Sequence, residues 1–297
     1  MRGLTSAVAG RWDCAVDPRP LAVARIGVGL AAFLIFIESY GRLSSVADGD
    51  LPLPAVGFLP AVTSGGAVVF LVTGLVAATA LATGVGVRLA APAVTALGWF
   101  GFVWEQQTYS NHMMLTAWLA LWLALTPCDA AWSVASRLGR RRVVRWGDQF
   151  LLMTQVSVCY LFAALVKISP RFLSGEALRD FVELDVDLPD RLWLVMSVLT
   201  VATELGLAVG LWLRRAKWVV APAGLMLHLS IPVAMPSQAL PLLAFSTLCL
   251  TQYPLFLAAP PDRPVRQGSA SQSLGGSSSS QDEDSFTTRQ PASSRRA

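Results

Sequence analysis

The chain has 297 residues, of which 54% are hydrophobic and 14% are charged, and its formal net charge is +4. A soluble domain carries roughly a quarter charged residues, so this composition excludes an ordinary soluble protein. The basic residues lie beside apolar runs and do not form one basic surface, so we expect no nucleic-acid partner.

Apolar runs of about 17 to 22 residues, the length that spans a bilayer, follow one another along the chain. They predict an all-α fold, a polytopic transmembrane helical bundle of about eight spans in the cell membrane. We place the spans near residues 20–38, 66–84, 88–105, 112–128, 148–168, 192–212, 217–234 and 238–257. The chain then divides into a cytoplasmic N-terminal segment (1–19), a transmembrane domain (20–259) and a disordered cytoplasmic tail (260–297), which is too polar to form a core.

The distribution of arginine predicts the orientation, because cytoplasmic loops of membrane proteins are enriched in Arg and Lys. Arginines cluster in the segments 137–145 and 214–215, whereas the long loops 39–65 and 169–191 contain few. Both termini are therefore predicted to be cytoplasmic, and these two loops to lie outside. The second loop has apolar residues at helix-like spacing, namely Leu178, Phe181, Val182 and Leu184. They predict a short amphipathic helix on the outer face.

Ionisable side chains inside membrane spans are costly and indicate function by default. Those within the predicted spans are Arg25, Glu38, His112, Lys167, Glu204 and His228. His112 begins the fourth span at the outer face, with Asn111 as a plausible N-cap, and Lys167 ends the fifth span at the same face. His228 lies roughly 8 Å below that face and Glu204 roughly 18 Å below it. Three scarce basic groups are thus predicted to converge in the outer leaflet.

Each of these residues also has a structural interpretation. Lys167, near a helix end, can extend its ammonium to the interface, and His112 or His228 can be a hydrogen-bonded packing residue. Arg25 can reach the inner face or pair with a neighbouring helix. Glu204, at mid-depth, must be protonated or paired.

The chain has 23 Lys and Arg residues, and just two of them, Lys167 and Lys217, are lysines. Arginine therefore supplies nearly all of the positive charge. An apolar site favours the neutral amine of a lysine, which can act as a general base or a Schiff-base nucleophile. Arginine stays protonated and cannot replace it. Tyr160 lies seven residues earlier on the same helix face, and Gln155 adds an amide further in.

The segment 155–175 reads QVSVCYLFAALVKISPRFLSG and resembles a motif of the vitamin K-dependent γ-glutamyl carboxylase family, whose bacterial relatives share the HTTM (horizontally transferred transmembrane) domain. Other predicted spans also resemble this family, with the sequences ARIGVGLAAFLIF, SNHMMLTAWLALWLALTP, ATELGLAVGLW and LMLHLSIPVAMPSQALPLLAF. The resemblance covers about residues 20–257. Animal enzymes of the family carry two lysines where this chain has Val166 and Lys167, usually a tryptophan in place of Phe172, and a large lumenal domain after the membrane part.

The resemblance implies that Lys167 is the base that acts with oxygen and reduced vitamin K. The strong base so formed removes a proton from a glutamate γ-carbon, which allows CO2 to add. By motif position, Asn111 and His112 correspond to the family's Asn-His pair, Glu204 to an intramembrane acid and His228 to a second histidine. The family's site faces the outer side of the membrane.

The first hypothesis is therefore an enzyme of the γ-carboxylase type, a lyase and quinol oxygenase, that takes a reduced naphthoquinone of the vitamin K or menaquinol type from the bilayer. Its predicted catalytic residues are Lys167, His112 and His228, and its predicted cofactor-binding residues are Asn111, Tyr160, Gln155 and Glu204. We predict no metal, because Glu204 lies too deep to complete a triad with the histidines.

The second hypothesis is a non-enzymatic binding or assembly protein that uses the same outer cavity for a lipid or a secreted peptide partner. An enzyme should lose activity when Lys167 becomes arginine, whereas a scaffold should tolerate the change. A small-solute transporter ranks last, because the polar groups cluster outward and only Glu204 lies deeper.

Overall fold

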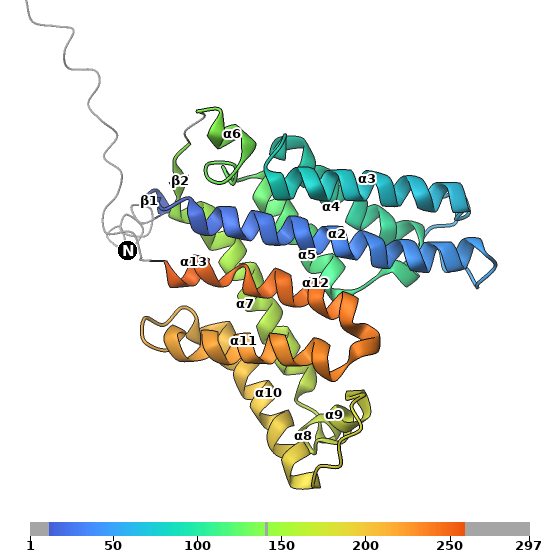
Figure 1. Cartoon of the computed structure of the whole chain (residues 1–297), viewed down its shortest axis with the longest axis vertical. Coiled ribbons are helices and arrows are strands. Elements are labelled where there is room, and N and C mark those ends of the chain that lie inside the picture. The colour runs from blue at the N-terminus through green and yellow to red at the C-terminus, as the bar shows by residue number, and fades with distance from the viewer. Residues whose placement is uncertain (1–11, 140–141, 259–297) are drawn as a thin grey trace, which may run out of the picture. The chain divides into compact units, whose positions relative to one another are not determined.

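Helices make up nearly all of the regular secondary structure in the computed structural model, which describes residues 12–139 and 142–258 (Figure 1). They are α2 (Arg19–Ala47), α3 (Ser64–Thr83), α4 (Val87–Trp104), η1 (Gln106–Thr108), α5 (Asn111–Ala124), α6 (Val134–Arg137), α7 (Trp146–Lys167), α8 (Pro170–Leu173), α9 (Glu176–Phe181), α10 (Asp190–Gly210), α11 (Lys217–Ala234), η2 (Pro236–Gln238), α12 (Ala239–Leu250) and α13 (Tyr253–Leu257). The strands of this part are β1 (Ala15–Val16) and β2 (Val144–Arg145), which pair antiparallel. The predicted all-α class is confirmed.

Seven segments of the described chain are long and apolar enough to cross a membrane. They are α2, α3, α4, α7, α10, α11 and the segment Pro236–Leu257, and they indicate a multi-pass membrane protein. The predicted span 112–128 is the exception, because α5 has 14 residues. A helix of that length is about 21 Å long, less than the hydrocarbon core of about 30 Å. The count of eight spans and the cytoplasmic placement of both termini stay predictions.

The predictions of a cytoplasmic N-terminal segment and of a disordered cytoplasmic tail concern residues that lie partly or wholly outside the described ranges. The tail 260–297 lies wholly outside them, and so do residues 1–11 of the N-terminal segment.

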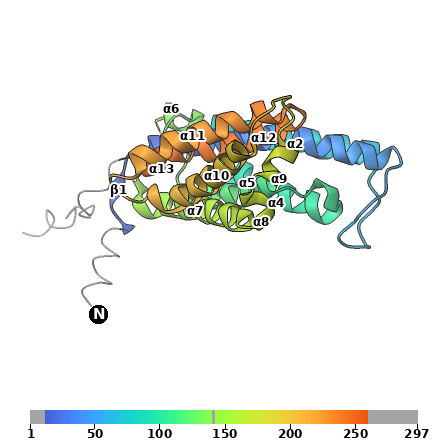
Figure 2. The same ribbon diagram turned by 90° about the horizontal axis from the view of Figure 1, so that it is seen from below.

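The central helix is α2, which packs against α3, α5 and α12 (Figures 1 and 2). Glycines allow its backbone to approach these neighbours closely. A Cβ on Gly29 would lie 2.6 Å from the backbone nitrogen of Ala82, and one on Gly27 would overlap the side chain of Thr251. Small residues at helix crossings are typical of membrane bundles, where close backbone approach increases dispersion contacts.

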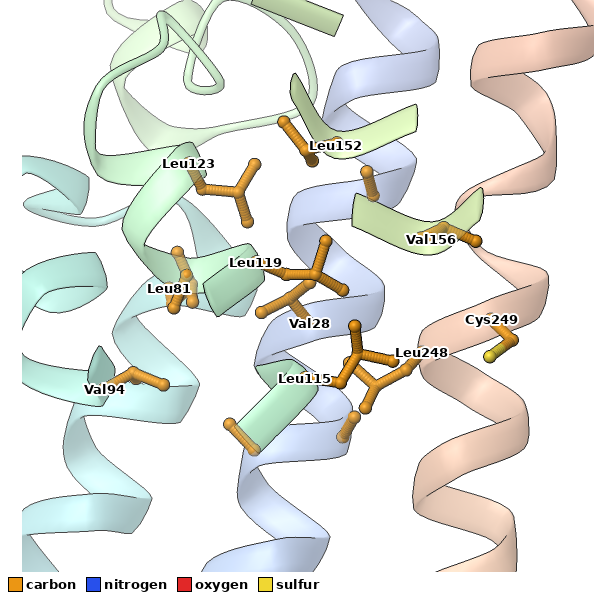
Figure 3. Close-up of a cluster of buried hydrophobic side chains, with 14 of the residues drawn as sticks. Val28, Leu81, Val94, Leu115, Leu119, Leu123, Leu152, Val156, Leu248 and Cys249 are labelled. Carbon is orange, nitrogen blue, oxygen red and sulfur yellow. The ribbon is translucent and has the colours of Figure 1, made fainter. Parts of the chain in front are cut away.

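The core lies where α2, α3, α4, α5, α7 and α12 meet, and Figure 3 shows a cluster of its buried side chains. The residues labelled there are Val28, Leu81, Val94, Leu115, Leu119, Leu123, Leu152, Val156, Leu248 and Cys249. The three leucines of α5 recur every four residues, so they lie on one face of that helix. This face anchors the short helix in the bundle.

The helix directions define two ends of the bundle. At one end, α4 and α7 finish and α5 begins. We call it the Lys167 end, after the last residue of α7. At the opposite end, the Arg25 end, α2 begins, α3 and α5 finish, and α4 and α7 begin.

Arg25 was predicted to reach the inner face or to pair with a neighbouring helix. It is fully buried, and the structure shows the pairing. Its guanidinium donates hydrogen bonds to four main-chain carbonyls at distances of 2.5 to 3.1 Å. These belong to Leu81, Ala82, Cys128 and Trp132. Leu81 and Ala82 lie in the last turn of α3, whose carbonyls have no partner within the helix. One side chain therefore links α2 to the end of α3 and to the segment after α5.

At the Lys167 end, hydrogen bonds to Glu105 hold the loop between α2 and α3 in place. The fully buried carboxylate of Glu105 accepts hydrogen bonds from the main-chain nitrogens of Leu53, at 2.9 and 3.2 Å, and Gln107, at 3.1 Å. The indole of Trp104 donates to the carbonyl of Pro60 at 2.8 Å. These bonds hold the loop over the end of α4, directly before the turn that leads into α5.

The loop between α7 and α10 contains two short helices, α8 and α9, where one amphipathic helix was predicted. Leu178 and Phe181 lie in α9, whereas Val182 and Leu184 follow its end. None of the residues of α9 is buried. Pro170 and Gly175 divide the segment, since proline begins α8 and Gly175 adopts a left-handed φ of 89° between the two helices.

The carboxylate of Glu183 connects this loop to η2 through hydrogen bonds. It accepts hydrogen bonds from the hydroxyl and, at 2.8 Å, from the main-chain nitrogen of Ser237, and these bonds hold the pKa of Glu183 below its usual range. A carboxyl with a lowered folded pKa stabilises the attachment above its unfolded pKa, and this contribution disappears as the pH falls through the folded value.

We therefore expect the loop 182–189 to exchange its amide hydrogens faster as the pH falls below about 4.5, after correction for the intrinsic pH dependence of exchange. Hydrogen exchange with mass spectrometry measures this protection. In Glu183→Gln the corrected protection should no longer change over that range. An equal change in the variant would contradict this role of Glu183.

Candidate functional site

Lys167 is the last residue of α7, and Glu204 of α10 holds its ammonium. The Nζ atom donates to Glu204 Oε1 at 2.8 Å and Oε2 at 3.0 Å, and to the carbonyl of Ala163 at 3.2 Å. The side chain of Lys167 is 28% exposed and that of Glu204 is 9% exposed. The two predicted site residues therefore form a half-buried ion pair. Glu204 was predicted to be either protonated or paired, and the structure shows it paired.

The depth predicted for Glu204 needs correction. Counting from the start of the span placed it well below Lys167, as if all helices began at one level. In the structure, the short helices α8 and α9 pack against α10, so α10 extends beyond the end of α7 (Figure 1). Glu204 consequently lies beside the end of α7 and can meet Lys167.

A cavity of about 610 Å³ lies beside this ion pair, and we call it the Lys167 cavity. Its polar lining residues are Asn111, His112, Gln155, Lys167, Glu204 and Gln238. Its apolar lining residues are Met114, Leu115, Val158, Cys159, Phe162, Ala163, Val166, Met235, Pro241, Leu242 and Phe245. Five of the seven predicted site residues therefore share one cavity, with His112 and Lys167 both in its wall.

His112 is bound to an acidic residue that was not among the predicted site residues. Its Nε2 lies 2.6 Å from Oε2 of Glu38, whose other oxygen accepts a hydrogen bond from Arg42 at 2.9 Å. An ionised carboxylate can only accept hydrogen bonds, so Nε2 of His112 bears the proton. In the neutral ring, Nδ1 is then the nitrogen with the lone pair.

Asn111 is the first residue of α5 and not its N-cap, which corrects the prediction. The N-cap is Ser110, whose hydroxyl accepts from the main-chain nitrogen of Met113 at 3.2 Å. The Asn111 side chain is therefore not needed to cap the helix. Its Oδ1 accepts a hydrogen bond from Tyr109 at 3.2 Å, and the residue lines the cavity.

Glu38→Gln tests whether Glu38 sets the tautomer of His112. A glutamine can offer its NH2 to Nε2, which would move the ring proton to Nδ1, so we expect the ring ¹⁵N signals of His112 to change. His112 and His228 are both histidines of the chain, so selective ¹⁵N-histidine labelling of a protein without a histidine tag gives a readable spectrum. The signals of His228 serve as the internal control. Unchanged His112 signals would contradict the role of Glu38.

His228 and Tyr160 are not part of the cavity wall, although both were predicted in the site. Each is 1% exposed. Tyr160 Oη lies 2.7 Å from His228 Nε2 and 2.9 Å from the hydroxyl of Tyr253, and Nδ1 of His228 has no hydrogen-bond partner within the described residues. The ring of Phe245 lines the cavity and lies 5.6 Å from the ring of His228. His228 thus belongs to a buried network behind Phe245.

Gln155 lines the cavity, and its Oε1 accepts a hydrogen bond from the indole of Trp122 at 3.4 Å. Its amide NH2 has no partner among the hydrogen bonds within the described residues. Within residues 12–139 and 142–258, no group of three or more His, Cys, Asp or Glu side chains is arranged to hold a metal ion.

Sequence reasoning missed two parts of the site. Glu38 was recognised as an intramembrane acid, but Arg42 follows it by four residues on the same helix face, a spacing that is typical of an ordinary surface ion pair. The wall formed by η2 and the start of α12, with Gln238 and Leu242, has no distinctive sequence pattern. The position of η2, which Glu183 fastens, brings this wall to the cavity.

Comparison with known families gives one match over most of the chain. The family described as the HTTM domain matches residues 14–260. No curated protein and no solved structure matches the chain.

Proposed function

Since the chain belongs to the HTTM-domain family, which is associated with vitamin K-dependent carboxylase-like membrane proteins, we propose that it is a membrane enzyme acting on a reduced naphthoquinone in the Lys167 cavity. The proposed chemistry is of the epoxidase or carboxylase type, with Lys167 as the base. In this proposal the cavity opens toward the outer leaflet of the cell membrane, where a peptide or protein substrate would reach it.

The observation that carries this proposal is the ion pair of Lys167 and Glu204 in the wall of a cavity whose lining is mostly apolar. The proton can move from Nζ to Oε1 across 2.8 Å. This transfer converts two charges into a neutral amine and a neutral acid, and apolar surroundings disfavour separated charges. The amine formed in this way can accept a hydroxyl proton from a bound ligand.

The residues of the cavity fit a fused aromatic quinol with a lipid tail. A volume of about 610 Å³ lies in the usual range for small-molecule sites, about 300–1,000 Å³. Phe162, Phe245 and Leu242 supply apolar walls for the rings and the tail. Asn111 and Gln155 supply amide groups for the quinol hydroxyls.

His112 is the second group that can move a proton in this site. Its Nε2–H is held by Glu38, so the ring has one fixed orientation and one defined tautomer. Nδ1 can therefore accept a proton, and the carboxylate of Glu38 would stabilise the charged ring. His228 does not line the cavity, so we assign it no direct contact with the ligand.

When bound, a reduced naphthoquinone supplies the reducing equivalents, and its reaction with O2 gives the quinone epoxide and water. The test offers a reduced naphthoquinone and oxygen to purified full-length protein and measures the epoxide by mass spectrometry. Leu242→Trp fills the cavity and should abolish epoxide formation. Leu243→Trp is the matched control, since Leu243 is exposed and does not line the cavity. Absence of epoxide from folded wild-type protein with verified reduced substrate would overturn the proposal.

A second candidate is a non-enzymatic binding or assembly protein for a lipid or a secreted peptide. The observation that favours it is that Glu204 and the carbonyl of Ala163 already bind the ammonium of Lys167, as they would for a structural lysine. In that case the wild type forms no epoxide, and a lipid or peptide added to the purified protein is bound by the wild type and Leu243→Trp but not by Leu242→Trp.

A further inference from the structure

A second cavity, of about 380 Å³, lies at the Arg25 end of the bundle. Its lining comes from the first turn of α4, from the end of α5 with the segment that follows it, and from the residues before β2. The lining residues are Val87, Arg88, Ala124, Leu125, Thr126, Pro127, Asp129, Arg142 and Val143. We call it the Arg88 cavity. It is lined by the end of α5, whereas the Lys167 cavity is lined by the start of that helix and shares no lining residue with it, so it is a different site.

The lining of this cavity contains two arginines and one acidic residue, so only one arginine has an acidic partner there. Arg142 donates to Asp129 at 3.2 Å, and the Asp129 side chain is 13% exposed. Arg88 has no ion pair or side-chain hydrogen bond within the described residues. In the first turn of α4, the main-chain nitrogens of Leu89 and Ala90 already donate to the carbonyl of Gly86, at 2.8 and 3.0 Å. The turn therefore adds at most the N–H groups of Val87 and Arg88. The cavity therefore offers an anion one unpaired guanidinium and a second one shared with Asp129.

The rim of the cavity is apolar and exposed. Leu125 and Val143 line it and are 66% and 62% exposed, and Leu89, next to Arg88, is 80% exposed. Such side chains would be costly to leave in water but suit the acyl chains of a lipid. A free anion would use the arginines and leave this rim uncovered, whereas an anionic phospholipid uses both parts.

We propose that the Arg88 cavity binds the headgroup of an anionic phospholipid. The phosphate lies between Arg88 and Arg142, and the acyl chains cover Leu89, Leu125 and Val143. Basic pockets between membrane helices on the cytoplasmic side are suited to such headgroups, and the arginine distribution predicts that this end of the bundle is cytoplasmic. This proposal does not depend on the chemistry of the Lys167 cavity.

The test titrates phosphatidylglycerol or phosphatidylcholine into full-length protein in detergent and follows bound lipid by native mass spectrometry and the unfolding midpoint. The wild type should bind phosphatidylglycerol more tightly than phosphatidylcholine. Arg88→Gln should weaken phosphatidylglycerol binding about fivefold, the effect of one arginine near the membrane surface. Asp129→Asn should strengthen it, because it removes the charge that competes for Arg142.

Arg191→Gln is the matched control, because Arg191 is also an exposed arginine in the first turn of a span helix, away from this cavity. It should leave phosphatidylglycerol binding unchanged. Equal binding of both lipids by the wild type, or equal weakening by Arg88→Gln and Arg191→Gln, would overturn the proposal. Complete competition by inorganic phosphate would also overturn it, since it would identify a site for a free anion.

Discussion

Lys167→Arg is expected to lower epoxide formation about 10²- to 10⁴-fold, the usual contribution of a positioned general base. Arginine keeps the positive charge and can still pair with Glu204, so the loss would report the missing base and not a broken ion pair. Its guanidinium stays protonated and cannot become the neutral acceptor that the proposed chemistry needs. The rate of epoxide formation at saturating quinol measures the effect.

The chain provides a matched control for this substitution. Lys217 is its other lysine, and its Nζ donates to the carbonyls of Phe256 at 2.8 Å and Leu257 at 3.4 Å, at the end of α13. Lys217→Arg keeps a donor at this position, so its epoxide rate should stay near that of the wild type. Full epoxide formation by Lys167→Arg would exclude Lys167 as the base.

Arg25→Leu is expected to destabilise the fold by at least about 3 kcal/mol, because each buried carbonyl left without a partner costs about 1–3 kcal/mol. In this variant, four main-chain carbonyls at the Arg25 end lose the donor that Arg25 supplies, and of these Leu81 keeps a hydrogen bond from the main-chain nitrogen of Gly84 at 3.2 Å. For a chain of this size, we expect the unfolding midpoint to fall by about 6–12 °C. Thermal unfolding in detergent, followed by intrinsic tryptophan fluorescence, measures the shift.

Two further variants separate the hydrogen bonds of Arg25 from its charge. Arg25→Lys keeps the charge, but one ammonium cannot reach all four carbonyls, so an intermediate loss is expected. Arg19→Leu removes an exposed arginine from the same helix and should leave the midpoint nearly unchanged. A midpoint for Arg25→Leu equal to that of Arg19→Leu would show that the carbonyl network contributes little.

The departures from the carboxylase motif have different structural contexts. Val166, at the position of the first of the two consecutive lysines in the animal enzymes, lines the Lys167 cavity and is 75% exposed. The wall of the Lys167 cavity therefore carries one valine and one lysine at the positions of that motif's lysine pair. Phe172, where the family usually has tryptophan, is buried against Ala164 and Val201. It helps to pack α8 against the end of α7 and against α10, so it supports the site without lining it.

The sequence by itself determined the class of the fold and most of its helices. Long apolar runs have few stable alternatives to a membrane-spanning helix, because every main-chain polar group must be satisfied internally in lipid. It also identified Lys167, His112, Asn111, Gln155 and Glu204, because ionisable and amide groups stand out against apolar surroundings. These five residues line one cavity in the structure.

Only the tertiary structure decided which of these groups meet. The pairing of His112 with Glu38 and of Lys167 with Glu204 depends on how α2 lies beside α5 and how far α10 extends past α7. The same packing placed His228 behind Phe245 and outside the cavity. Sequence position gives the depth of a residue along its own helix. The rotation and offset of neighbouring helices arise from side-chain packing between segments far apart in the chain, which no local pattern encodes.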